Sequence, residues 1–203
     1  MKREHPVFAC FYEAMSWPAE WLGAKSGMNR MRSRLVARLG GRILEVGAGN
    51  GMNFIHYTDG AEVVGIEPDW EMLRRAIARA HGARARVSLV AADGEALPFA
   101  SGSFDAVVSC LVLCTVPDAR RALSEMRRVL KPSGQLHFVE HVRARRGWLA
   151  SIQDALDPAW ARVFAGCHPN RDTKSAIEAA GFRIEKMKEG AGGMMIRGCA
   201  LAV

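Results

Sequence analysis

The chain of 203 residues and 22.2 kDa, with 49% hydrophobic residues, is long and apolar enough for one globular domain, 1–203, with a sizeable core. No apolar run reaches the roughly 18 residues of a membrane span, and the N-terminus does not lead into the apolar block of a signal peptide. The net charge of +7 comes from scattered arginines, which argues against a nucleic-acid partner. Five cysteines without a Cys-x-x-Cys pair favour the reducing cytoplasm over a disulfide scaffold. We expect Cys110 and Cys114 to be core thiols and no metal to be bound.

The first 40 residues are predicted to form helices. A helical period over residues 1–17 places four apolar side chains on one face: Phe8, Phe11, Tyr12 and Met15. A second helix is expected over about residues 18–39, where the Gly40-Gly41 pair ends it. Segment 1–40 either packs on the core or closes over a ligand, and we expect it to close the site.

A glycine-rich turn follows the first predicted strand, Ile43–Val46. Three glycines stand at alternate positions: Gly47, Gly49 and Gly51. They let the backbone turn sharply and approach a ligand closely, and a helix over about Asn50–Tyr57 would place free N–H groups there. Met52 replaces the third glycine of a dinucleotide-binding fingerprint, and Glu45 precedes the turn. This pattern favours S-adenosylmethionine, which has an ammonium group and no pyrophosphate, over NAD; a turn without a ligand is the alternative.

Acidic residues follow the next two predicted strands. Glu67 comes directly after Ala61–Ile66 and 20 residues after Gly47, where an acid at a strand end can accept hydrogen bonds from both ribose hydroxyls. Asp93 follows a strand over about residues 86–91. It either accepts a hydrogen bond from an adenine amino group or caps the short turn of residues 95–97.

The rest of the chain alternates strands and helices. Asp69 and Asp118 are expected to cap two helices, the first with an inward face of Leu73, Ala76, Ile77 and Ala80. Further strands are expected over residues 106–110, 135–140, 182–188 and 194–203, and further helices over about 119–130 and 173–180. This alternation predicts an α/β fold, a doubly wound and mostly parallel sheet with its last two strands as a hairpin at the edge.

Segment 143–170 is predicted to be a helical insertion after strand five, broken at Pro158. It contains six large apolar residues: Trp148, Ile152, Leu156, Trp160, Val163 and Phe164. They form an acceptor pocket or pack on the sheet. As substrate-binding residues we expect Phe11, Trp148, Trp160 and His168.

His141 stands at the tip of the fifth predicted strand, where a substrate should approach the site. It is our candidate for a catalytic base or a group that stabilises a thiolate. The alternative is a structural hydrogen bond that fixes the loop.

Four segments resemble the class I S-adenosylmethionine-dependent methyltransferases: Glu45–Gly51, Glu67, Asp93 and Arg128–Gly134. A closer resemblance, over roughly residues 42–182, is to the methyltransferase-like 7 group, the microsomal alkyl-thiol S-methyltransferases. It rests on Val108–Val116, Phe138–Val142, Leu156–Trp160 and Gly166-Cys167 followed by Arg171. Members of that group carry an N-terminal membrane-anchoring segment, of which we expect no counterpart in this sequence.

The resemblance implies a seven-stranded sheet with one antiparallel strand and S-adenosylmethionine at the carboxyl ends of the parallel strands. It implies cofactor contacts at Glu45, Gly47, Gly49, Glu67, Asp93, Gly94 and Cys110, and we expect Tyr12, Ala48, Asn50 and Pro68 to complete this set. The implied activity is methylation of a small lipophilic acceptor, most simply a thiol. A phospholipid headgroup or quinone-type acceptor, and a cofactor-binding domain without catalysis, are the alternatives. We expect a monomer or homodimer and leave peripheral contact with a membrane surface open.

Overall fold

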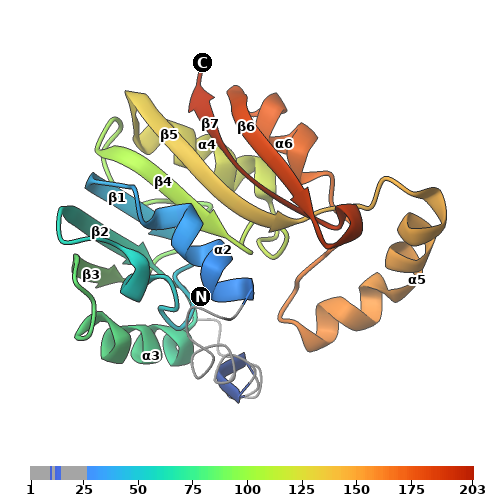
Figure 1. Cartoon of the computed structure of the whole chain (residues 1–203), viewed down its shortest axis with the longest axis horizontal. Helices are drawn as coiled ribbons and strands as arrows, with labels where there is room; N and C mark the ends of the chain where they lie inside the picture. Colours follow the sequence, from blue (N-terminus) through green and yellow to red (C-terminus); the bar gives the residue numbers. More distant parts are fainter. Residues whose placement is uncertain (1–9, 11, 15–26) are drawn as a thin grey trace.

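The computed structural model describes residue 10, residues 12–14 and residues 27–203 (Figure 1). Most of the predicted N-terminal helical region, including Phe11, therefore lies outside the described residues. Cys10 and residues 12–14 are helical. The second predicted helix is described as α2, Gly27–Val36.

Seven strands form one sheet in the order β3-β2-β1-β4-β5-β7-β6 (Figure 1). Their bounds are β1 Gly41–Val46, β2 Ala61–Ile66, β3 Arg86–Val90, β4 Phe104–Cys110, β5 Leu130–His141, β6 Phe182–Gly190 and β7 Met195–Ala202. The pairs among β1 to β5 are parallel, whereas β7 runs antiparallel to both β5 and β6. The predicted α/β fold, mostly parallel with one antiparallel strand and a closing hairpin, is confirmed.

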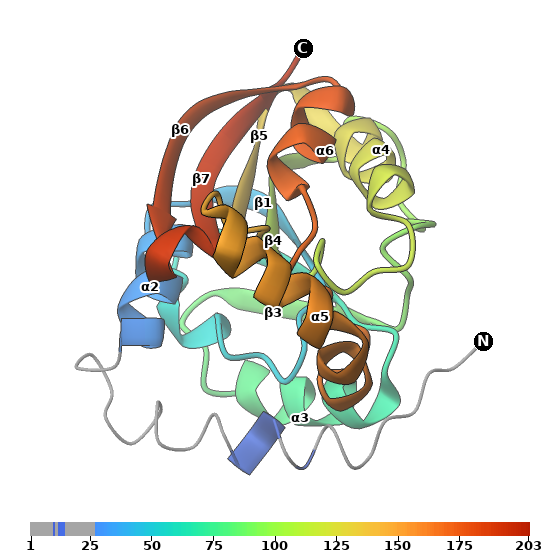
Figure 2. The same ribbon diagram turned by 90° about the vertical axis from the view of Figure 1, so that its right-hand side faces the viewer.

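Helices cover both faces of the sheet (Figure 2). The described helices are α2, α3 Trp70–Ala80, α4 Ala119–Val129, α5 Gly147–Val163 and α6 Thr173–Ala179, with the 3-10 segments η2 Phe54–His56 and η3 Ala191–Gly193. Of these, α5 does not lie on a face of the sheet but beyond the strand ends (Figure 1). One core cluster joins the sheet to α4 and α6, and a second joins its other face to α2, α3 and η2. Within the part of the chain that the structure describes, no helix is long and apolar enough to cross a membrane.

The predicted helix caps are present. The Asp69 side chain accepts a hydrogen bond from the Met72 amide, and that of Asp118 accepts from the Arg120 and Arg121 amides. Ile77, however, is 42% exposed, so its predicted inward position on α3 is wrong. The buried face of α3 consists of Met72, Leu73 and Ala76, and Ile77 lies at its border.

Two further boundaries differ from the prediction. The expected helix over Asn50–Tyr57 is wrong, because Gly51 has a φ of 84° and only η2 follows it. The predicted break at Pro158 is also wrong, since α5 continues through it as one helix. Pro158 occupies an exposed position, where the loss of one backbone hydrogen bond costs less than it would in a core.

Candidate functional site

A cavity of about 240 Å³ opens at the carboxyl ends of the parallel strands, beside α5. It brings together residues that are far apart in the sequence. Of the residues selected from the sequence, it is lined by Tyr12, Gly47, Gly49, Glu67, Pro68, Asp93, Gly94, Cys110, His141 and Trp160. The cavity therefore has one wall from the glycine turn and the acidic strand ends, and a second wall from the β4 end and α5.

The glycine turn is built for close approach. Gly47 has a φ of 64°, and a Cβ atom there would lie 2.6 Å from Val112 Cγ2. Gly49 has a φ of 57°, and a Cβ atom there would meet no other atom within 4 Å, so its backbone is accessible from the cavity. Its N–H donates a 2.9 Å hydrogen bond to Glu67 Oε2, which connects the turn to the end of β2.

Glu67 and Asp93 are the two acids on this wall. Glu67 Oε1 accepts a 2.9 Å hydrogen bond from the Asp69 amide, and burial raises the pKa of Glu67 to about 7. Asp93 Oδ1 accepts from the Glu95 amide at 3.0 Å. Asp93 thus caps its turn while it also lines the cavity, so the two alternatives weighed for it are compatible.

Glu45, Ala48 and Asn50 do not line the cavity. Glu45 is paired in register with Gly65, two residues before Glu67, so it lies deeper in the sheet than the strand ends, and its side chain is buried. There Tyr57 Oη donates to Glu45 Oε2 at 2.7 Å and Asn53 Nδ2 donates to Oε1 at 2.8 Å. Burial raises the pKa of Glu45 to about 7.

Arg32 on α2 is a buried charge that sequence patterns did not reveal. Its guanidinium donates to Asn53 Oδ1 at 2.8 Å, to Tyr12 Oη at 3.0 Å and to Cys110 Sγ at 3.6 Å. Burial opposes its charge, but Cys110, Tyr12 and Glu45 together raise the pKa of Arg32 above its ordinary value. Arg32 therefore connects Tyr12 of the N-terminal segment to the strand ends below the cavity.

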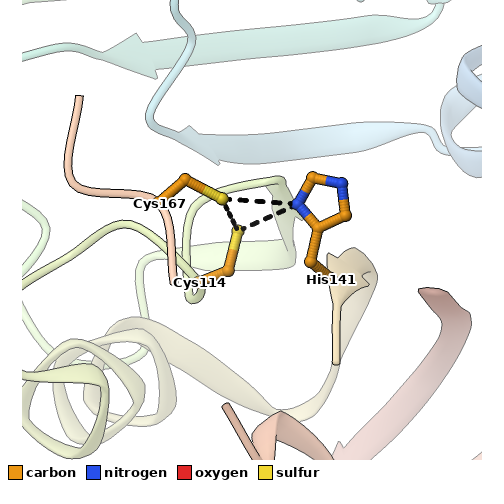
Figure 3. A group of neighbouring side chains, drawn as sticks. All are labelled: Cys114, His141 and Cys167. Carbon is orange, nitrogen blue, oxygen red and sulfur yellow. Dashed lines mark hydrogen bonds between the residues drawn. The ribbon is translucent and has the colours of Figure 1, made fainter. Parts of the chain in front are cut away.

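Three side chains meet on the second wall: Cys114, His141 and Cys167 (Figure 3). The two sulfurs are 3.6 Å apart, and His141 Nδ1 lies 3.6 Å from Cys114 Sγ and 3.4 Å from Cys167 Sγ. The contact with Cys114, followed by that with His141, lowers the pKa of Cys167 to about 5. The contact with Cys167 raises the pKa of Cys114 well above its ordinary value and also raises that of His141.

Glu140 supports this wall from below. The carboxylate is fully buried and accepts three hydrogen bonds, from Ser109 Oγ at 2.7 Å, the Val112 amide at 3.1 Å and the Cys114 amide at 3.2 Å. Burial raises its pKa. Glu140 thus fixes the turn after β4 that presents Cys114 to the cluster.

Two of the expected substrate-binding residues lie elsewhere. Trp148 is 61% exposed and does not line the cavity, so its predicted place in the pocket is wrong. His168 does not line the cavity either, and its Nδ1 forms a 2.8 Å hydrogen bond with Asp157 Oδ2. Trp160 does line the cavity and stacks on Phe164, with 4.1 Å between ring centroids.

Comparisons with known proteins agree with this geometry. Residues 44–138 match the family model described as a methyltransferase domain. The chain is 39% identical over 150 residues to the human thiol S-methyltransferase TMT1A, over 72% of this chain and 62% of that protein. It is 35% identical over 135 residues to a phosphatidylethanolamine N-methyltransferase of Cereibacter sphaeroides, over 66% of each. It thus spans less than two thirds of the length of these relatives.

A solved structure with similar architecture is a SAM-dependent methyltransferase from Thermotoga maritima described as a possible histamine N-methyltransferase. The TM-score is 0.66 at 21% identity, over 97% of this chain and 98% of that one. At this identity the likeness concerns the fold alone.

Proposed function

Since the chain belongs to the class I S-adenosylmethionine-dependent methyltransferases, we propose that it methylates the sulfur atom of a small lipophilic thiol. One observation carries the choice of acceptor. The segments that resemble alkyl-thiol enzymes, Val108–Val116, Phe138–Val142 and Gly166-Cys167, are distant in the sequence but meet on the second wall of the cavity. That wall faces the position where an acceptor would lie beside the cofactor.

The first wall fits S-adenosylmethionine. The bare backbone at Gly49 admits a ligand, and the buried Glu67 carboxyl group can accept hydrogen bonds from ribose hydroxyls. Asp93 and Gly94 would face the adenine ring. The cofactor supplies an electrophilic methyl group on a sulfonium sulfur.

The chain itself then has to align the acceptor, exclude water and favour the thiolate. Alignment of two reactants can contribute roughly 7–11 kcal/mol. Trp160 and Phe164 provide an apolar boundary for a lipophilic acceptor. Since a free thiol has a pKa of about 8.5, a nearby cationic group is enough to ionise it.

The experiment is a cofactor-consumption screen with the full chain and acceptors of similar size: an alkyl thiol, a phenol, a phospholipid amine and a quinol. We expect formation of the demethylated cofactor with the thiol at a rate well above the others. Preference for the phospholipid amine or the quinol would overturn the thiol assignment. Tight cofactor binding without turnover of any acceptor would instead favour a non-catalytic binding domain.

Glu67→Ala is expected to weaken S-adenosylmethionine binding about tenfold, because the ribose hydroxyls and the Gly49 amide lose a hydrogen-bond acceptor. Glu62→Ala is the matched control, since Glu62 lies on the same strand but is exposed. Calorimetric titration of both variants measures the effect. Equal dissociation constants for Glu67→Ala and wild type would show that Glu67 does not hold the cofactor.

The outer face of α5 suggests how a lipophilic acceptor arrives, and we propose that it contacts an anionic membrane surface. Four large side chains on one face of the helix are more than one third exposed: Trp148, Ile152, Leu156 and Val163. Trp160 continues this apolar stripe to the cavity. Arg146 and Arg162 are exposed near the two ends of α5, where they would attract anionic lipid.

Replacing Trp148, Ile152 and Leu156 together with serine is expected to lower binding to vesicles about tenfold, because three apolar contacts with the bilayer are lost. Co-sedimentation with phosphatidylcholine vesicles containing phosphatidylserine measures the bound fraction. Ile55→Ser with Ile77→Ser is the control, since both side chains are exposed on other elements. Equal sedimentation of the two variants would contradict the assignment of this face.

A further inference from the structure

We propose that Cys114, His141 and Cys167 bind one zinc ion whose fourth coordination position opens into the cavity. We also infer that the acceptor thiol binds at this open position as a thiolate, and this second part rests on the proposed function. From the sequence we expected no metal, and only Cys110 with Cys114 came into question as a pair of ligands. In the structure Cys110 lies against Arg32 instead, and the partners of Cys114 come from the end of β5 and from the segment after α5.

The distances within the cluster are those of a tetrahedral zinc site. Zinc binds sulfur at about 2.3 Å and imidazole nitrogen at about 2.0–2.1 Å. Tetrahedral angles then place two sulfur ligands about 3.8 Å apart and a sulfur and a nitrogen about 3.6 Å apart. The cluster has 3.6 Å between the sulfurs, and 3.6 Å and 3.4 Å between the sulfurs and Nδ1. All three side chains thus point at one common centre (Figure 3).

The backbone holds the two cysteine ligands in place. The Cys114 amide donates to Glu140 Oε2 at 3.2 Å, and the Cys114 carbonyl accepts from the His168 amide at 2.6 Å. Ala165 and Gly166 have φ values of 48° and 87°. A non-glycine residue with positive φ is uncommon, and this strained turn directs Cys167 back toward the cluster. Such organisation lowers the cost of assembling a metal site.

The burial of the ligands indicates a catalytic rather than a structural site. His141 and Cys167 line the cavity, whereas Cys114 lies behind them and is fully buried. Structural zinc sites have four protein ligands, and catalytic sites have three with one open position. His141 presents Nδ1 to both sulfurs, and its Nε2 points away from them (Figure 3).

Zinc would supply the deprotonation that thiol methylation needs. The acceptor thiol binds the open position and releases its proton to solvent, since a coordinating thiol is deprotonated outright. A sulfur electron pair then forms the bond to the methyl carbon, while the bond from that carbon to the sulfonium sulfur breaks. The electron pair of the broken bond stays on the leaving cofactor, which becomes a neutral thioether. The methylated acceptor is also a neutral thioether, a weaker ligand than a thiolate, and it leaves the metal.

The test measures metal directly. The full chain is produced without an affinity tag, purified with a non-chelating reductant and assayed for zinc by elemental mass spectrometry. We expect about one zinc per chain in the wild type and in Cys199→Ser, because Cys199 is a free cysteine on β7 outside the cluster. We expect a loss of at least about tenfold in Cys114→Ser and Cys167→Ser, since each removes one of three ligands.

Cobalt spectroscopy keeps the test valid if a variant folds poorly. Co²⁺ is added to metal-stripped wild type and Cys199→Ser, whose folding is checked by circular dichroism, and sulfur-to-cobalt charge-transfer bands should appear. They should be weaker in Cys167→Ser and shifted in His141→Ala. Absence of zinc and of these bands in folded, reduced wild type would overturn the proposal, as would unchanged zinc in both cysteine variants.

The two proposals fail separately. If the cluster binds zinc but no thiol is turned over, the metal site is supported and the thiol methyltransferase assignment is wrong. If a protein without zinc turns over thiols, the thiol methyltransferase assignment is supported and the metal site is wrong.

Discussion

Glu140→Ala is expected to lower the free energy of unfolding by about 4 kcal/mol. The carboxylate is fully buried and accepts hydrogen bonds from Ser109 Oγ and from the amides of Val112 and Cys114. Alanine leaves all three donors without this acceptor, and each stranded buried donor costs about 1–3 kcal/mol. The turn that carries Leu111 to Cys114 would lose its anchor, and the second wall of the cavity would lose its shape.

Urea unfolding followed by circular dichroism measures this loss. Glu140→Gln retains one carbonyl oxygen, so it should lose less stability than alanine. Glu62→Ala is the control for removing a strand glutamate, because Glu62 is exposed. A loss below about 1 kcal/mol for Glu140→Ala, within the range of ordinary surface substitutions, would show that the three donors find other partners.

The fold could be predicted because its signals are local. Apolar runs mark β1, β2 and β4, and Asp69 and Asp118 stand where helix caps are needed and form those caps. The alternation of strands and helices then allows few topologies. The errors are local as well: Gly51 at positive φ prevents the helix that was predicted over Asn50–Tyr57.

The site could be predicted only where it follows the strand ends. Glu67 and Asp93 line the cavity because parallel strands deliver their carboxyl ends to one edge. Glu45 does not, because it lies level with Gly65, two residues before Glu67, where its carboxylate accepts hydrogen bonds from Asn53 and Tyr57.

The sulfur and imidazole cluster has no local signal. Its members are separated by 27 and 26 residues along the chain, so no ligand spacing of a known metal motif arises. Only the packing of the segment after α5 against the ends of β4 and β5 brings them together. Arg32 was missed for a similar reason, because its partners Asn53, Tyr12 and Cys110 come from three other segments.

Trp160→Ala is expected to raise the acceptor KM about 30-fold, or about 2 kcal/mol, while cofactor affinity stays nearly unchanged. Trp160 is 37% exposed, stacks on Phe164 and lines the second wall of the cavity. Its removal takes apolar contact away from a lipophilic acceptor. The glycine turn, Glu67 and Asp93 are contributed by other elements, so the cofactor wall should keep its geometry.

The comparison with Trp148 makes this prediction specific. Trp148→Ala removes an indole from the same helix, but that indole is exposed and does not line the cavity. In an assay with a water-soluble thiol and no vesicles, Trp148→Ala should therefore keep the wild-type acceptor KM. Trp160→Phe should recover most of the loss, because it retains an aromatic ring beside Phe164. If Trp160→Ala and Trp148→Ala changed the acceptor KM equally, the acceptor would not bind against the second wall. If Trp160→Ala weakened the cofactor as much as the acceptor, the two walls would not act separately.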